Sequence, residues 1–418
     1  MTREETTVPA ERSSAAAFYT LLSVMFLNML GFGIIVPLLP FYGESFHAEP
    51  WQVMAIFSAY SMGSFFGEPF WGRLSDRIGR KPILISTTLA NCVCYGLLAF
   101  APNIWLAFII RFFGGMAAGN GSTVQGYIAD VTPTDERASR MSRLGAAYNF
   151  GMIFGPFVGG SLAKTSVGPL GFQIPLLAAS MLALGSSIGI ALIVPESRAR
   201  KIAREKQPSR WAMVGYAARH PVIGRLMLLT FFVGFAFTGI EANFGLWANA
   251  RFHWSPRDIG ICFGLTGVIS CICQFFVTGP LSRRYGEARM LAIGMVGTVI
   301  ASALQPLSDG GASTVALMCL VALSSSVAFP NSGALMSRVI DEDHQGQVGG
   351  LNNALGAMAR VLGPQAGALS RGIFGINAPF VVGAMIVAPA ILLAVAAGRA
   401  AMRLGRGETA AGGSQFSH

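Results

Sequence analysis

Charged residues are scarce in this chain. Asp, Glu, Lys and Arg make up 12% of its 418 residues, whereas 53% of the residues are hydrophobic. A soluble protein carries about 25% charged residues. The shortage of charge excludes a soluble globular fold and leaves no room for a sizeable soluble domain. It predicts an all-α membrane protein that crosses the lipid bilayer many times.

Several chemical motifs are also missing. The sequence has no nucleotide-binding loop, no metal-ligand cluster and no pairing of a nucleophile with a base, so we expect no enzyme activity and no cofactor. The six cysteines lie in apolar runs, which favours small packing residues over metal ligands or disulfides. The N-terminus lacks the pattern of a signal peptide, and we expect residues 1–16 to form a cytoplasmic tail.

Runs of about 20 mostly apolar residues predict membrane-spanning helices. Six such runs form the first half, at 17–40, 51–71, 83–101, 104–129, 141–164 and 172–194. Six more form the second half, at 224–247, 258–280, 290–307, 312–337, 346–369 and 376–398. The predicted organisation is therefore a six-helix bundle over 17–194, a cytoplasmic linker over 195–223, a second bundle over 224–398 and a cytoplasmic tail over 399–418. Within the linker, Trp211–His220 is a candidate surface helix.

The basic residues are distributed unevenly. A net charge of +10 could suggest nucleic-acid binding, but the basic residues gather in the loops on one side of the predicted helices. The loops on the other side hold only Lys164, Arg251, Arg257 and Arg371. Because cytoplasmic loops are rich in Lys and Arg, this asymmetry predicts a multi-pass membrane protein with both termini in the cytoplasm, and no nucleic-acid partner.

One short segment, Gly72–Pro82, is strongly charged and lies between two apolar runs. A segment this polar cannot lie in hydrocarbon, so we expect it to form a tight cytoplasmic loop. A weaker copy, Gly279–Gly286, follows the eighth predicted helix as the first follows the second. Two related six-helix halves are typical of an alternating-access carrier.

The segment Gly72–Pro82 resembles the loop signature of the major facilitator superfamily. The fifth predicted helix carries a pattern that resembles the motif of the drug/proton antiporters in that superfamily: Gly151, Gly155, Pro156, Gly159 and Gly160. Within this group the sequence is similar to the tetracycline/proton antiporters and related multidrug exporters, which implies efflux associated with antibiotic resistance. One departure is Asn28, because the tetracycline antiporters carry an acid at this place in the first helix. Asn28 cannot exchange a proton, so that proton site cannot be transferred to this chain.

The resemblance implies a gate at the loop. The candidate gating residues are Gly72, Asp76, Arg77, Gly79, Arg80 and Asp130. We expect Asp76 to tie the second helix to the eleventh in one state, and Asp130 to pair with Arg77. The alternative is a solvated turn whose charges only set topology. The glycines of the fifth helix would form a close, bendable contact between the halves, and ordinary small-residue packing is the alternative.

Charges inside spans are costly and usually functional. The candidates for proton coupling are Glu241, Glu68, Arg111 and Arg360. Glu241 and Glu68 are the leading candidates for the proton site, and Arg111 is a candidate modulator. The neighbours of Glu241 are apolar, which suits a carboxyl group that takes up and releases a proton in a carrier. The alternatives are a structural ion pair or an interfacial acid for Glu241, structural pairing for Glu68, and pairing with an acid or with carbonyl groups for Arg360.

Aromatic and amide side chains within the spans could line a substrate cavity. The candidates are Asn28, Tyr60, Gln125, Tyr148, Asn149, Phe235, Gln274, Asn331 and Asn352. Together they would suit an amphiphilic small molecule, although aromatic residues in membrane helices often face lipid or packing partners.

These observations predict a monomeric carrier that exports an amphiphilic compound in exchange for protons. A uniporter or proton symporter for a metabolite, lipid or siderophore is an alternative, which the neutral Asn28 favours and the motif in the fifth helix disfavours. A ligand sensor is a third possibility, but it would need a soluble signalling domain.

Overall fold

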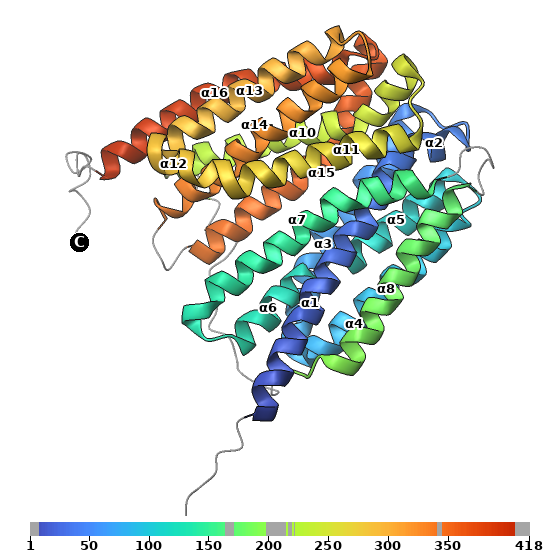
Figure 1. Ribbon diagram of the computed structural model, residues 1–418, viewed down its shortest axis with the longest axis vertical. Coiled ribbons are helices and arrows are strands. Elements are labelled where there is room, and N and C mark those ends of the chain that lie inside the picture. Colours follow the sequence, from blue (N-terminus) through green and yellow to red (C-terminus); the bar gives the residue numbers. More distant parts are fainter. Residues whose placement is uncertain are drawn as a thin grey trace, which may run out of the picture. The chain divides into compact units, whose positions relative to one another are not determined.

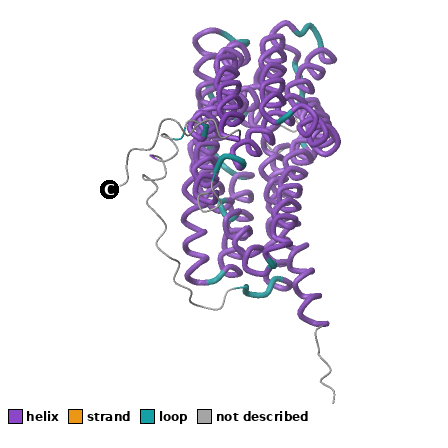
Figure 2. Tube along the Cα trace, turned by 90° about the vertical axis from the view of Figure 1, so that its left-hand side faces the viewer, coloured by secondary structure: helices purple, strands orange, loops and turns teal. Residues whose placement is uncertain are grey.

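The computed structural model describes residues 8–163, 171–197, 215, 220, 222–340 and 345–405. Within these ranges the chain forms helices joined by short connections and contains no β-strand (Figure 2). Most of the predicted linker, including nearly all of the candidate surface helix Trp211–His220, lies outside the described residues, as do the two ends of the chain.

The helices follow the predicted spans. The first part of the chain forms α1 (Val8–Ile35), η1 (Val36–Leu38), α2 (Leu39–Glu44), α3 (Pro50–Ile78), α4 (Arg80–Ala99), α5 (Ile104–Ala118), α6 (Gly121–Val131), α7 (Thr134–Leu162) and α8 (Gln173–Ile193). The second part forms α10 (Ile223–Phe252), α11 (Pro256–Ile272), the π-helix η3 (Cys273–Thr278), α12 (Gly279–Tyr285), α13 (Glu287–Leu304), η4 (Gln305–Leu307), α14 (Gly311–Ser337), α15 (Gln345–Phe374) and α16 (Ala378–Gly405). Each of the twelve predicted spans falls on one long helix or on consecutive helices, which confirms the all-α membrane fold.

Nine helical stretches of the described residues are long and apolar enough to cross a membrane. The other long helices, α3, α7 and α15, carry more polar residues and glycine. Large apolar side chains such as Leu192 and Leu392 are more than 70% exposed. In a protein that crosses the bilayer, such side chains suit contact with lipid.

The chain divides by its internal contacts into two compact units. The first unit is Met1–Ala203 with Gly245–Gly264, and the second is Arg204–Phe244 with Leu265–His418. Helices α10 and α11 therefore contribute to both units. The predicted bundle boundaries, 17–194 and 224–398, stay a prediction.

Each unit has its own buried core. In the first unit, α1 runs beside α7 and α8, while α3 packs against α5 and α4 against α8 (Figure 1). Its core includes the fully buried Leu21, Leu84 and Ile190. In the second unit, α13 packs against α14 and α16, and the core includes Leu226 and Met295. The two cores hold the charged and polar residues described below in defined positions.

The predicted tight loop over Gly72–Pro82 is wrong in one respect. Helix α3 continues to Ile78 and α4 begins at Arg80, so Gly79 alone joins the two helices. A helix satisfies its own backbone hydrogen bonds and can therefore continue past the hydrocarbon into water. Gly79 has a φ of 110°, which favours glycine and turns the chain between the two helices.

Candidate functional site

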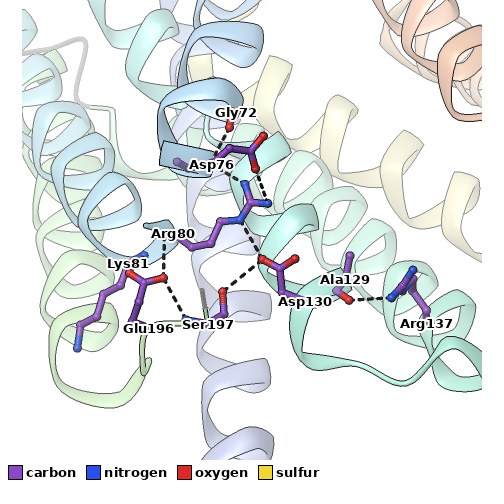
Figure 3. A network of polar contacts seen from close by, with 10 residues as sticks. Gly72, Asp76, Arg80, Lys81, Ala129, Asp130, Arg137, Glu196 and Ser197 are labelled. Carbon is purple, nitrogen blue, oxygen red and sulfur yellow. Dashed lines mark hydrogen bonds and ion pairs between the residues drawn. The ribbon is translucent and has the colours of Figure 1, made fainter. Parts of the chain in front are cut away.

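Arg80 connects three helix ends at one end of the first unit (Figure 3). It is the first residue of α4 and only 5% exposed. Its guanidinium group lies 2.9 Å from Asp76 Oδ1 on α3 and 3.1 Å from Asp130 Oδ2 on α6. It also donates to Ser75 Oγ over 2.7 Å. A single buried cation thus holds the ends of α3, α4 and α6 together.

The predicted partner of Asp130 was wrong, because Asp130 pairs with Arg80 and not with Arg77. The single-residue turn at Gly79 places Arg80 four residues after Asp76, on the side that faces α6, whereas Arg77 is exposed. Gly126 of α6 makes room for this arrangement, since a Cβ atom there would lie 2.6 Å from the Arg80 guanidinium carbon. Sequence reasoning overlooked Gly126, although it lies one helical turn before Asp130.

Sequence reasoning also overlooked Glu196, which follows α8. Its carboxylate accepts hydrogen bonds from the backbone N–H groups of Arg80, over 2.8 Å, and Lys81, over 3.1 Å (Figure 3). These are among the first N–H groups of α4, which have no partner within the helix. An acid at this end also interacts favourably with the helix dipole. Glu196 therefore caps α4 and ties it to the end of α8. Its only signal in the sequence was an acid directly after a predicted span.

The glycines of the antiporter-like motif bring α7 into close contact with its neighbours in the first unit. A Cβ atom at Gly155 would lie 2.7 Å from the Cα of Gly33 on α1. One at Gly159 would collide with the backbone of Ile34, and one at Gly160 with the backbone at the start of α11. Backbones approach this closely only where side chains are absent. The predicted role of the motif as a contact between two halves stays a prediction.

Arg111 of α5 is buried and lies against aromatic rings. It is 3% exposed, and its guanidinium carbon lies 4.3 Å from the ring centroid of Tyr60 and 5.8 Å from that of Phe32. Its Nε has no hydrogen-bond partner. In the part of the chain that the structure describes, Arg111 forms no ion pair, and its close partners are the aromatic faces.

Asn28 belongs to a buried chain of neutral hydrogen bonds. Its amide donates to Asn120 Oδ1 over 3.2 Å, and Asn120 donates to Thr87 Oγ1 over 3.0 Å. Asn120 lies at the break between α5 and α6, where the chain leaves regular helical hydrogen bonding. None of these three side chains can exchange a proton at ordinary pH, so they act here as fixed polar contacts between α1, α4 and this break.

Helices α10 and α15 of the second unit carry Glu241 and Arg360. The half-buried carboxyl group of Glu241 on α10 lies within electrostatic range of the exposed Arg360 on α15. Two residues further on, the fully buried Asn243 donates to the backbone oxygen of Gly239 over 2.8 Å and to that of Pro364 over 3.3 Å. These contacts hold α10 and α15 side by side. Two of the four predicted coupling residues, Glu241 and Arg360, therefore lie within electrostatic range of each other, and their coupling role stays a prediction.

The other predicted site residues occupy varied surroundings. Asn331 is buried and donates to the Val327 oxygen within its own helix. Glu68 has an exposed side chain, and its backbone oxygen accepts a hydrogen bond from Ser122.

The remaining cavity candidates differ in burial. Gln125, Tyr148 and Gln274 are exposed, whereas Asn149, Phe235 and Asn352 are half-buried. Tyr148 lies within electrostatic range of Tyr60. A single cavity lined by all nine candidates stays a prediction.

Many membrane-spanning helices, with ion pairs at a helix junction and single charged residues within the spans, fit a membrane carrier. The family model of the Major Facilitator Superfamily matches residues 21–364, and a second match covers residues 226–413. The chain belongs to the Major Facilitator Superfamily. This confirms the resemblance drawn from Gly72–Pro82 and from the motif in α7.

Individual relatives support the same assignment. The tetracycline resistance protein, class C, of Escherichia coli is 28% identical over 83% of this chain and 88% of its own length. Multidrug resistance protein 2 of Bacillus subtilis strain 168 is 25% identical over 86% of this chain and 89% of its own length. A bacterial homolog of the human lysosomal transporter Spinster has the same fold, with a TM-score of 0.75 at 14% identity over 96% of this chain and 98% of that chain.

Proposed function

We propose that this protein exports an amphiphilic small molecule across the bacterial inner membrane in exchange for protons, by alternating access. The relatives that support export of a drug-like compound are a tetracycline resistance protein and a multidrug resistance protein. The observation that carries the coupling mechanism is the half-buried carboxyl group of Glu241 inside the membrane-spanning helix α10, within electrostatic range of Arg360 on α15. Charges in such positions are costly and usually have a function.

In the proposed cycle, Glu241 alternates between two protonation states. The ionised carboxylate attracts Arg360, whereas the protonated carboxyl group loses most of this attraction. Proton uptake from outside and release to the inside would therefore change how tightly α10 and α15 hold each other. Such a change can bias which side of the carrier is open. Glu68 stays a candidate for a second proton site.

The remaining proposed roles follow from position. Arg80, Asp76 and Asp130 would hold the cytoplasmic helix ends together in one state and release them in the other. The close packing of the α7 glycines would prevent a leak along this helix. The carrier would act as a monomer, with both termini in the cytoplasm and with Arg111 as a modulator of proton coupling.

Proteoliposomes with an imposed pH gradient test the proposal. Purified protein should drive uphill flux of tetracycline or ethidium, and nigericin, which collapses the gradient, should stop it. Glu241→Gln should abolish uphill flux and retain binding of the same compound. Glu136→Gln, a change at an acid on the exposed part of α7, is the matched control and should transport normally. Flux that persists after nigericin treatment would exclude antiport.

A second candidate function is uniport, or symport with protons, of a metabolite or lipid. The neutral chain of hydrogen bonds from Asn28 to Asn120 favours it, because no acid occupies this part of α1. Direction distinguishes the two functions. A symporter accumulates substrate on the side to which protons flow, whereas an antiporter accumulates substrate on the opposite side.

A further inference from the structure

Among the residues that the structure describes, no acidic side chain balances the charge of Arg111. The groups that interact with it electrostatically are Tyr95, Tyr60 and Cys94, and none of them is a carboxylate. Asn28 of α1 is neutral and donates its hydrogen bond to Asn120. A buried charge without a partner is expensive, because removal from water costs several kcal/mol per ion.

Arg111 and two tyrosines gather buried hydrogen-bond donors in one place. Among the described residues Arg111 Nε is buried without a hydrogen-bond partner, and the hydroxyl groups of Tyr60 and Tyr95 lie next to each other beside it. Each of the three side chains is at most 5% exposed. A guanidinium group and two phenolic hydroxyl groups can all donate to one anion, and guanidinium binds a carboxylate through two parallel hydrogen bonds.

The surroundings of these donors are aromatic. The rings of Tyr60 and Phe32 lie 4.9 Å apart between centroids, and the guanidinium group lies over both. A ligand that places its charge on Arg111 would therefore bring its apolar part against ring faces. This combination fits a molecule with one oxyanion and an aromatic or lipophilic body.

We propose that the substrate supplies the anion that Arg111 lacks, so that the transported compound is an amphiphilic carboxylate bound at Arg111, Tyr60 and Tyr95. This inference rests on the proposed export function and specifies its substrate class. The carboxylate accepts from the Arg111 guanidinium group and the two tyrosine hydroxyls. Its binding thereby gives the buried Arg111 Nε an acceptor and places a further acceptor beside the two hydroxyl groups.

Equilibrium binding to the full-length protein in nanodiscs, without any ion gradient, tests this assignment. The probes are pyrenebutyrate, pyrenebutanol and pyrenebutylamine, which share one aromatic body and differ in charge. Hydrogen bonds to a charged group contribute about 1.5–3 kcal/mol, so pyrenebutyrate should bind about 10- to 150-fold more tightly than the alcohol. Arg111→Gln should remove this preference, and Arg111→Lys should keep part of it.

A matched control and a fold check accompany the variants. Arg143→Gln, a change at an exposed arginine of α7, should leave the ranking of the three probes unchanged. If Arg111→Gln does not yield folded protein, the ranking measured with the wild type decides alone. Equal or tighter binding of pyrenebutanol or pyrenebutylamine by the wild type would overturn the assignment, as would an unchanged ranking in folded Arg111→Gln.

Two further outcomes separate this inference from others. Complete displacement of pyrenebutyrate by equimolar sodium phosphate or chloride would assign the site to an inorganic anion and overturn the substrate assignment. Anion-selective binding that depends on Arg111, without flux driven by a pH gradient, would support the inference and exclude proton antiport. Ethidium flux driven by the pH gradient, together with binding that shows no preference for the anionic probe, would support proton antiport and overturn the substrate inference.

Discussion

The close approach of α7 to α1 predicts opposite effects for the same substitution at two glycines of one helix. Gly155→Ala adds a methyl carbon that would lie 2.7 Å from the Cα of Gly33 and 2.7 Å from the backbone oxygen of Leu30. Carbon atoms pack best at about 3.5–4.0 Å. Because both neighbours belong to the backbone of α1, a side-chain rotation cannot relieve the overlap, and the helices must move apart.

The size of the effect follows from two opposing contributions. Alanine in a helix interior is more stable than glycine by about 1 kcal/mol. Overpacking of a close contact costs about 1–3 kcal/mol, so Gly155→Ala should lower the free energy of unfolding by up to about 2 kcal/mol. A Cβ atom at Gly145 meets nothing within 4 Å. Gly145→Ala should therefore raise the free energy of unfolding by most of the roughly 1 kcal/mol by which a helix favours alanine over glycine, which makes it the matched control.

Unfolding of the two variants in mixed micelles, with increasing sodium dodecyl sulfate and detection by circular dichroism, measures the difference. We expect Gly145→Ala to unfold at a higher detergent fraction than the wild type and Gly155→Ala at a lower one, with about 1–3 kcal/mol between them. Equal stability of the two variants would refute the close backbone contact between α7 and α1.

Two further predictions concern the junction around Arg80. Arg80→Gln leaves two aspartates without their shared cation and should lower the free energy of unfolding by about 2–3 kcal/mol in the same assay. The cost is less than for a fully buried ion pair because both acids are partly exposed. The control is Arg77→Gln at an exposed arginine, which should change the free energy of unfolding by less than about 0.5 kcal/mol. Glu196→Ala removes the cap of α4 and should cost about 0.5–2 kcal/mol. It should also speed hydrogen exchange at the amides of Arg80 and Lys81, and unchanged protection there would contradict the capping role.

The sequence by itself determined the positions of the helices. Hydropathy is a sum over neighbouring residues, so twelve spans could be located without knowledge of their packing. The motifs at Gly72–Pro82 and in α7 were sufficient to predict the superfamily, since both are contiguous. The candidate coupling residues were found for the same reason, because a charge inside an apolar run is visible in the chain alone.

Only the tertiary structure decided which side chains meet. Successive residues of an α-helix point about 100° apart, so a small difference in rotation or in where a helix ends selects a different partner. Because the chain turns at Gly79, Asp130 forms its ion pair with Arg80 rather than with Arg77, and Glu196 contacts the start of α4. The proximity of Glu241 to Arg360, and the absence of a recorded acid beside Arg111 among the described residues, likewise depend on helices far apart in the chain.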